Sequence, residues 1–179
     1  MNLVPYPEAY IRYLVYFHGL RDYFECHEVL EEHWKKDEKE NRKKYWVGLI
    51  QIAVALYHQR RKNFKGAEKL MKNAINIIRM EKEAIHSLSL DYSKLLLILE
   101  TRYREMLNKQ EYTSIHLPII SNQLIELCKK ECKKLNCIWG SESNLKNDEL
   151  VHKHMLRDRS ERMKERGNHK ERREATRKH

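Results

Sequence analysis

The segment Trp46-Val-Gly-Leu-Ile-Gln-Ile-Ala-Val-Ala-Leu-Tyr-His58 is apolar on nearly every side, with Gln51 and His58 as its clear exceptions. A helix at the surface of a globular protein normally shows a charged face at the 3.6-residue period, whereas a helix that is apolar all round is buried. The small residues of the segment, glycine and alanine, allow neighbouring helices to approach closely. The segment therefore predicts the central helix of a helical core.

Proline and glycine are scarce throughout the chain. Its 179 residues include 3 prolines and 5 glycines, and no proline occurs between Pro7 and Pro118. Because these residues break helices and mark tight turns, their scarcity favours helices over strands joined by turns. Charged residues make up 35% of the chain, which suits several amphipathic helices. We expect an all-α fold: a compact helical bundle of about five core helices, a sixth short helix, and a basic C-terminal tail that is helical or disordered.

Capping residues set the expected helix boundaries. Asp22, Asp91 and Ser121 each precede a run of periodic apolar residues, and their side chains can accept a hydrogen bond from an N–H of the first turn. Asn63 is expected to end the central helix in the left-handed conformation. The expected helices run from Pro7 to Gly19, from Asp22 to about Lys36, from Lys43 to Lys62, from Phe64 to His86, from Asp91 past Tyr103, and from Ser121 past Cys128.

Basic residues are concentrated at the C-terminus. The net charge is +10, and residues 149–179 hold eleven Lys or Arg and six Asp or Glu. Such a segment favours polyanions, so one interpretation is a structural or interaction protein whose tail contacts nucleic acid or an acidic partner. The alternative is a solubilising terminus. We divide the chain into a helical bundle domain over 1–110, a peripheral helix and linker over 111–148, and a basic tail over 149–179.

The cysteine content and the longest apolar run indicate the compartment. Four cysteines in a chain without an export signal indicate reduced thiols in the cytoplasm. The longest apolar run, residues 47–57, contains Gln51 and is too short to span a bilayer. We therefore expect a cytoplasmic protein without a membrane-spanning segment. No glycine-rich phosphate loop or serine elbow occurs in the sequence, so nothing supports nucleotide or serine-hydrolase chemistry.

Polar side chains interrupt the apolar faces of two expected helices. His27 and Glu31 lie one turn apart, on a face that also carries Trp34. Gln51 and His58 lie two turns apart on the central helix. Burying a carboxylate costs several kcal/mol unless it is paired. We therefore expect these groups to be mostly buried and to converge on one another or on a ligand.

Three interpretations of this cluster remain open. In the first, Glu31 accepts hydrogen bonds from the imidazole and amide groups, and the network fixes the helix register. In the second, the cluster lines a pocket for a small molecule and provides a histidine for acid–base chemistry; its candidate residues are His27, Glu31, Gln51, His58 and Trp34. In the third, His27, Glu31 and His58 bind a divalent metal ion such as zinc in an open three-ligand site. The sequence names no reaction.

Several short motifs follow one another in a set order. They are Phe24-Glu-Cys-His-Glu-Val-Leu-Glu-Glu-His-Trp34, Gly48-Leu-Ile-Gln-Ile-Ala, Tyr57-His58, Asn63 and Gly66-Ala67. This pattern resembles domain-of-unknown-function family 309, a bacterial family of small all-helical proteins, over about Tyr10 to Met106. The resemblance implies an all-α bundle and leaves the activity unnamed. The family usually has glycine before this asparagine, where this chain has Lys62.

Overall fold

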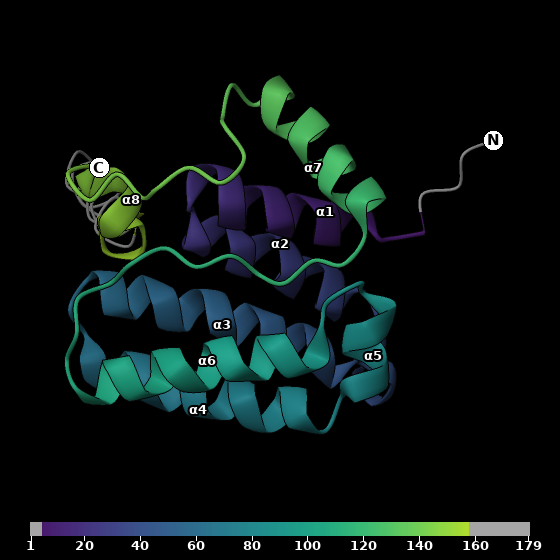
Figure 1. The fold of residues 1–179 in the computed structure, drawn as a ribbon, viewed down its shortest axis with the longest axis horizontal. Helices are drawn as coiled ribbons and strands as arrows, with labels where there is room; N and C mark the ends of the chain where they lie inside the picture. Colours follow the sequence, from purple (N-terminus) through teal and green to yellow (C-terminus); the bar gives the residue numbers. More distant parts are fainter. Residues whose placement is uncertain (1–4, 158–179) are drawn as a thin grey trace, which may run out of the picture. The chain divides into compact units, whose positions relative to one another are not determined.

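The computed structural model describes residues 5–157, and helices are its only regular elements there (Figure 1). The all-α prediction is confirmed. The elements are α1 (Glu8–Val15), the π-helical turn η1 (Tyr16–Leu20), α2 (Tyr23–Lys35), the 3-10 turn η2 (Lys39–Asn41), α3 (Lys44–Arg60), α4 (Phe64–Arg79), α5 (Lys82–Ser87), α6 (Tyr92–Leu107), α7 (Asn122–Lys134) and α8 (Asp148–Val151).

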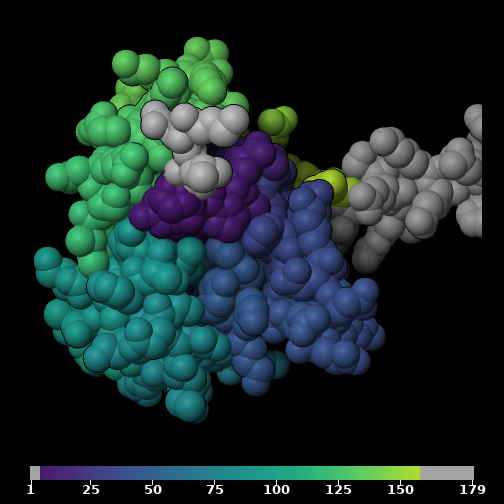
Figure 2. All heavy atoms as spheres, turned by 90° about the vertical axis from the view of Figure 1, so that its right-hand side faces the viewer, coloured from purple at the N-terminus to yellow at the C-terminus, as the bar shows by residue number. Residues whose placement is uncertain are grey.

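Helix α3 is the centre of the bundle, as its apolar sequence predicts. It packs against α2 and α4, while α6 packs on α4 and α1 packs on α2 (Figure 1). Helix α7 packs on α1, and Figure 2 shows the purple surface of the α1 region bordered by the green α7 segment. Gly48 lets α4 approach α3, since a Cβ there would lie 3.1 Å from side-chain atoms of both Ile77 and Ile78.

Three of the predicted caps are confirmed. Asp22 accepts a hydrogen bond from the Glu25 N–H (3.2 Å), and Asp91 accepts one from the Lys94 N–H (3.0 Å). Ser121 likewise caps α7 through the N–H of the third residue after it. These bonds satisfy N–H groups that have no partner within their own helix.

The turn between α3 and α4 corrects one prediction. The left-handed residue is Lys62 (φ 64°), and Asn63 instead caps α4 by accepting a bond from the Gly66 N–H (3.2 Å). Glycine adopts a positive φ without the steric cost that a Cβ imposes. The left-handed conformation at position 62 explains why the family that this chain resembles usually has glycine there.

Two expected helices differ from the sequence prediction. The expected helix from Phe64 to His86 is two helices, because Glu81 has non-helical dihedral angles (φ −123°, ψ 36°) between α4 and α5. The first helix changes to a π-helical turn at Tyr16, and left-handed Arg21 (φ 51°) ends that turn. The apolar pattern of the sequence indicates neither the break at Glu81 nor the π-helical turn.

The chain forms two compact units, Met1–Ser143 and Asn144–His179. In the second unit, Asn147 caps the short helix α8. Most of the expected basic tail over 149–179 lies outside the described residues, so nucleic-acid binding by that tail stays a prediction. Within residues 5–157, no helix has the length and apolar character needed to cross a bilayer.

An extended segment, residues 111–120, joins α6 to α7 and runs along the bundle; we call it the strap (Figure 1). Its backbone groups are bonded at alternate residues, as an extended chain allows. The Thr113 carbonyl accepts from Arg102 (2.7 Å), the Ile115 carbonyl from Arg21 (2.5 Å), and the Leu117 N–H donates to His18 (3.0 Å). Side chains thus satisfy backbone groups that a neighbouring strand would satisfy in a sheet.

His18 is buried, with 1% of its surface exposed. Its Nδ1 bonds the Leu14 carbonyl (2.9 Å), and its Nε2 accepts from the strap. These two bonds fix the neutral tautomer. Burial lowers the pKa of His18 to about 3, and the nearby Arg21 charge acts in the same direction.

His18 makes the stability of the fold depend on pH. In the unfolded chain its pKa is about 6.5, so between pH 6.5 and about 3 the unfolded state binds a proton that the native state excludes. The contribution is complete above about pH 6.5 and is lost as the pH falls. We expect the unfolding free energy of the wild type to fall toward pH 4 more steeply than that of His18→Gln, by up to about 1.4 kcal/mol per pH unit.

Chemical denaturation at a series of pH values measures this difference in slope. His86→Gln is the matched control, because His86 is exposed on α5. Equal slopes in the wild type and His18→Gln would contradict the assignment of His18 as a buried neutral histidine.

Candidate functional site

Helix α2 carries the polar residues that the sequence singles out. Because residues four apart share a helix face, His27 Nε2 lies 2.7 Å from Glu31 Oε2. Lys35, one turn further on, places its Nζ 2.5 Å from Glu31 Oε1. The two oxygens of the Glu31 carboxylate are thus held by different partners.

Glu28 is also part of this cluster. Its Oε1 lies 3.4 Å from His27 Nδ1. One ligand atom from each of His27, Glu28 and Glu31 lies within 4.8 Å of the others, and all three residues are half-buried. One imidazole and two carboxylates at this spacing could supply ligand atoms to a divalent cation.

The surroundings of the Glu31 carboxylate favour its negatively charged form. The hydrogen bond from Lys35 lowers the pKa of Glu31, and His27 adds to this effect against the opposing effect of partial burial. At neutral pH, a cation binding to Glu31 has no carboxyl proton to displace.

His27 and Glu31 are half-buried, so they are enclosed less completely than the sequence suggests. Their side chains are 32% and 30% exposed. The fully buried face of α2 carries Tyr23, Cys26 and Leu30 instead, which places His27 and Glu31 at the edge of that face. The carboxylate therefore keeps contact with water as well as with its partners.

Gln51 on α3 has a buried side-chain oxygen without a hydrogen-bond partner among the described residues. Its Oε1 is buried and accepts no hydrogen bond within the described part of the chain. A buried acceptor in this state costs about 1–3 kcal/mol. Gln51 is half-buried as a residue, and its oxygen is covered by surrounding atoms.

His58 contacts the turn between α3 and α4. Its Nδ1 lies 3.1 Å from Asn63 Nδ2. A Cβ at Gly66 would lie 2.7 Å from Asn63 Nδ2 and 3.3 Å from His58 Cγ, so this glycine makes room for both side chains. The three residues occur at this spacing because they contact one another in the turn between α3 and α4.

Trp34 is half-buried near the end of α2. The Arg42 guanidinium lies 4.8 Å from the centroid of its ring, at a distance typical of a cation–π contact. The structure therefore brings His27 and Glu31 into direct contact and adds Glu28. It places Gln51, His58 and Trp34 in the separate settings described above.

Sequence reasoning missed two sets of polar residues. Glu28 was not among the candidate residues, and its position next to His27 was the signal that could have included it. The second set lies beneath the strap, where His18, Arg21, Gln59 and Arg102 are almost wholly buried. No pattern in the sequence identifies these four as buried.

Comparisons with known proteins place the chain among relatives without an assigned activity. The family described as "Domain of unknown function (DUF309)" matches residues 10–70. The chain is 50% identical to "Uncharacterized protein YpuF" of Bacillus subtilis (strain 168) over 172 residues, which cover 96% of this chain and 99% of that protein. No solved structure matches the chain.

Proposed function

This chain belongs to the DUF309 family, and we propose that it binds a divalent transition-metal ion through His27, Glu28 and Glu31 of α2. The observation that carries the proposal is the convergence of three ligand atoms within 4.8 Å on one face of a single helix. Compared with the sequence-based metal hypothesis, Glu28 takes the place of His58. The turn contact of His58 with Asn63 gives that histidine a structural role.

The chemistry of the donors supports a transition metal. Imidazole nitrogen suits zinc and its neighbours in the first transition row, and carboxylate oxygen binds these ions as well. Two ligand atoms that share one ion at bonds of about 2.0–2.2 Å lie about 3.0–3.5 Å apart, so His27 Nε2 and Glu31 Oε2, which are 2.7 Å apart, must first separate slightly. A small side-chain rotation that replaces their hydrogen bond by two metal bonds would admit it.

Lys35 supports the geometry of Glu31 from outside the metal site. Its ammonium group holds Oε1, which leaves Oε2 directed toward His27. Partners that hold the remote oxygen of a ligating carboxylate fix its orientation. Because the three residues are half-buried, positions on the ion would stay open to water or to a small anionic molecule. We propose exchangeable metal binding and no specific reaction.

Metal titration of protein purified without a histidine tag tests the proposal. At a free metal concentration one hundred times the Kd, binding should raise the unfolding free energy by about 2.7 kcal/mol, seen as a higher melting temperature. We expect this for at least one of zinc, manganese and iron(II). Glu31→Gln should weaken binding at least ~10-fold, because it removes a charged ligand from the first coordination sphere.

Glu32→Gln is the matched control, because Glu32 is an exposed glutamate of the same helix outside the cluster. Its titration should match that of the wild type. An unchanged melting temperature with all three metals would contradict metal binding. If native mass spectrometry then showed a retained organic molecule, the second candidate, a small-molecule pocket that uses the unbonded Gln51 oxygen, would be favoured.

A further inference from the structure

Two cysteines meet at the C-terminal end of α7. The Cys137 N–H donates to the Cys132 carbonyl (3.0 Å), and the Asn136 N–H donates to the Lys133 carbonyl (3.2 Å). Asn136 is left-handed (φ 55°). These features define a Schellman motif, in which the side chains at the positions of Cys132 and Cys137 come into contact. The backbone of the helix end thus brings the two sulfur atoms together.

Gly19 of η1 lies against both thiols. A Cβ added to this glycine would lie 2.8 Å from Cys132 Sγ and 2.8 Å from Cys137 Sγ. The thiols also hydrogen-bond to each other. The absence of a side chain at Gly19 is therefore what gives the sulfur pair its room.

Cys137 is held in this position from its other side. The Gly140 N–H donates to the His18 carbonyl (2.9 Å), and the Arg21 Nε donates to the Ser141 carbonyl (2.7 Å). These bonds fasten the chain just after Cys137 to the end of η1. The sulfur pair is consequently part of a fixed structure rather than a chance approach of two side chains.

We propose that Cys132 and Cys137 are a reversible oxidation site, forming an intramolecular disulfide when the protein meets a peroxide. The two residues differ in access: Cys132 is 1% exposed, whereas Cys137 is partly exposed. Cys137 is therefore the sulfur that reacts with the oxidant, and Cys132 is the one that resolves the product. The disulfide closes the α7 cap covalently beside Gly19.

The reaction balances with hydrogen peroxide as the oxidant. The Cys137 thiolate attacks one peroxide oxygen, the O–O bond breaks, and the products are a sulfenic acid and hydroxide, which takes up a proton as water. Cys132 sulfur then attacks Cys137 sulfur, the S–O bond breaks, and the hydroxyl group leaves as water with the Cys132 proton. Two thiols and one peroxide give one disulfide and two waters. A dithiol reductant reverses the process by exchange.

Burial raises the pKa of Cys132 to about 12, and its hydrogen bond with Cys137 acts in the same direction. Because the thiolate is the attacking species, the resolving step should be slow at neutral pH and faster at higher pH.

The test treats the folded full-length protein with excess hydrogen peroxide, blocks the remaining thiols and measures the intact mass and the cross-linked peptides. We expect free thiols to fall from four to two, with a Cys132–Cys137 link that dithiothreitol reverses. Cys137→Ser should abolish the loss. Cys128→Ala should still form the Cys132–Cys137 disulfide, because Cys128 is a separate buried thiol one turn before Cys132 on the same helix.

A second variant tests the geometry itself. Gly19→Ala places a methyl group against both sulfur atoms, so we expect disulfide formation to slow at least ~10-fold in protein that circular dichroism shows to be folded. Three outcomes would overturn the proposal: four thiols that survive peroxide, a link through Cys26 or Cys128, or stable oxygen addition to Cys137 without a cross-link.

Discussion

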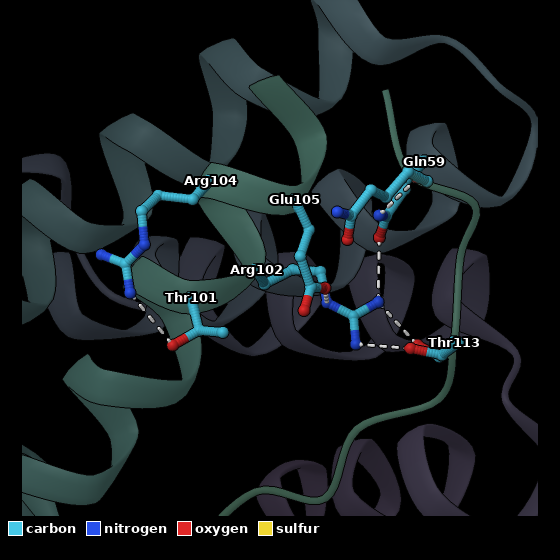
Figure 3. A network of polar contacts seen from close by, with 7 residues as sticks. Gln59, Thr101, Arg102, Arg104, Glu105 and Thr113 are labelled. Atoms are coloured by element: carbon cyan, nitrogen blue, oxygen red, sulfur yellow. Dashed lines mark hydrogen bonds and ion pairs between the residues drawn. The ribbon is translucent and has the colours of Figure 1, made fainter. Parts of the chain in front are cut away.

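Arg102→Ala is expected to lower the unfolding free energy by about 3 kcal/mol. Arg102 on α6 is 5% exposed, and its guanidinium lies between α3 and the strap (Figure 3). Its Nη1 donates to Gln59 Oε1 (3.1 Å) and to the Thr113 carbonyl, and its Nη2 donates to Thr113 Oγ1 (2.9 Å). Its Nε also pairs with Glu105 (3.0 Å). Alanine removes all four interactions.

The largest part of the loss comes from Gln59. This side chain is wholly buried, so without Arg102 its Oε1 loses a donor that water cannot easily replace. Thr113 and Glu105 are more exposed and can regain hydrogen bonds from solvent. Arg102→Lys should have an intermediate effect, because an ammonium group cannot reach Gln59 and Thr113 with the fixed fork of a guanidinium.

Arg104→Ala is the matched control for this experiment. Arg104 is exposed on the same helix, and its Nη2 donates a hydrogen bond to Thr101 Oγ1 (3.4 Å). Figure 3 shows this side chain pointing away from the Arg102 network. Its replacement should change the unfolding free energy by less than about 0.5 kcal/mol. Urea denaturation at pH 7 measures both. If the two alanine variants have the same stability, the network does not support the fold.

The helices and their starts could be predicted because their determinants are local. An Asp or Ser before a periodic apolar run reaches an N–H three residues later whatever the rest of the chain does, and Asp22, Asp91 and Ser121 all do so. The central position of α3 follows equally from its own composition. By contrast, the apolar pattern did not indicate the break at Glu81 or the π-helical turn at Tyr16.

The strap could not be predicted for a related reason. Charged residues are usually exposed, so arginine in a helical pattern indicates a solvated position. Arg21 and Arg102 are buried because the strap offers them backbone carbonyl groups, which a sequence does not display. The residues of the strap show no alternating apolar pattern long enough to indicate a strand, and among the described residues their backbone pairing with another segment is limited to the bridge between Leu90 and Ile119.

In the candidate site, too, contacts within one helix could be predicted and contacts between helices could not. The contact between His27 and Glu31 follows from their spacing on one helix. Whether Gln51 and His58 approach them depends on the rotation of α3 against α2, which periodicity does not determine. Glu31 is half-buried because a residue at the edge of an apolar face can keep its carboxylate partly in water.

Arg21→Ala is expected to lower the unfolding free energy by about 3 kcal/mol as well, and to free the strap selectively. Arg21 is 0% exposed. Its Nη1 donates to the Ile115 carbonyl and its Nε to the Ser141 carbonyl, so one side chain fastens both the strap and the segment after Cys137 to η1. Its own carbonyl accepts a bond from Arg60 Nη1 (2.6 Å), which alanine would keep.

Two companion variants separate the causes of this loss. Arg21 has a positive φ of 51°, which costs a residue with a Cβ about 1–2 kcal/mol. Arg21→Gly relieves that cost while it removes the same side-chain bonds, so it should be about 1 kcal/mol more stable than Arg21→Ala. Arg12→Ala is the exposed control on α1 and should have little effect.

Hydrogen exchange shows whether the effect is local. Without the Arg21 side chain, the strap keeps the bonds of Thr113 to Arg102 and of Leu117 to His18. It loses the bond at Ile115, which lies between these two residues. Amides of residues 111–120 should therefore exchange faster in Arg21→Ala by a larger factor than amides of α3, the central helix of the core. A uniform increase across both segments would mean that Arg21 supports the whole bundle rather than the attachment of the strap.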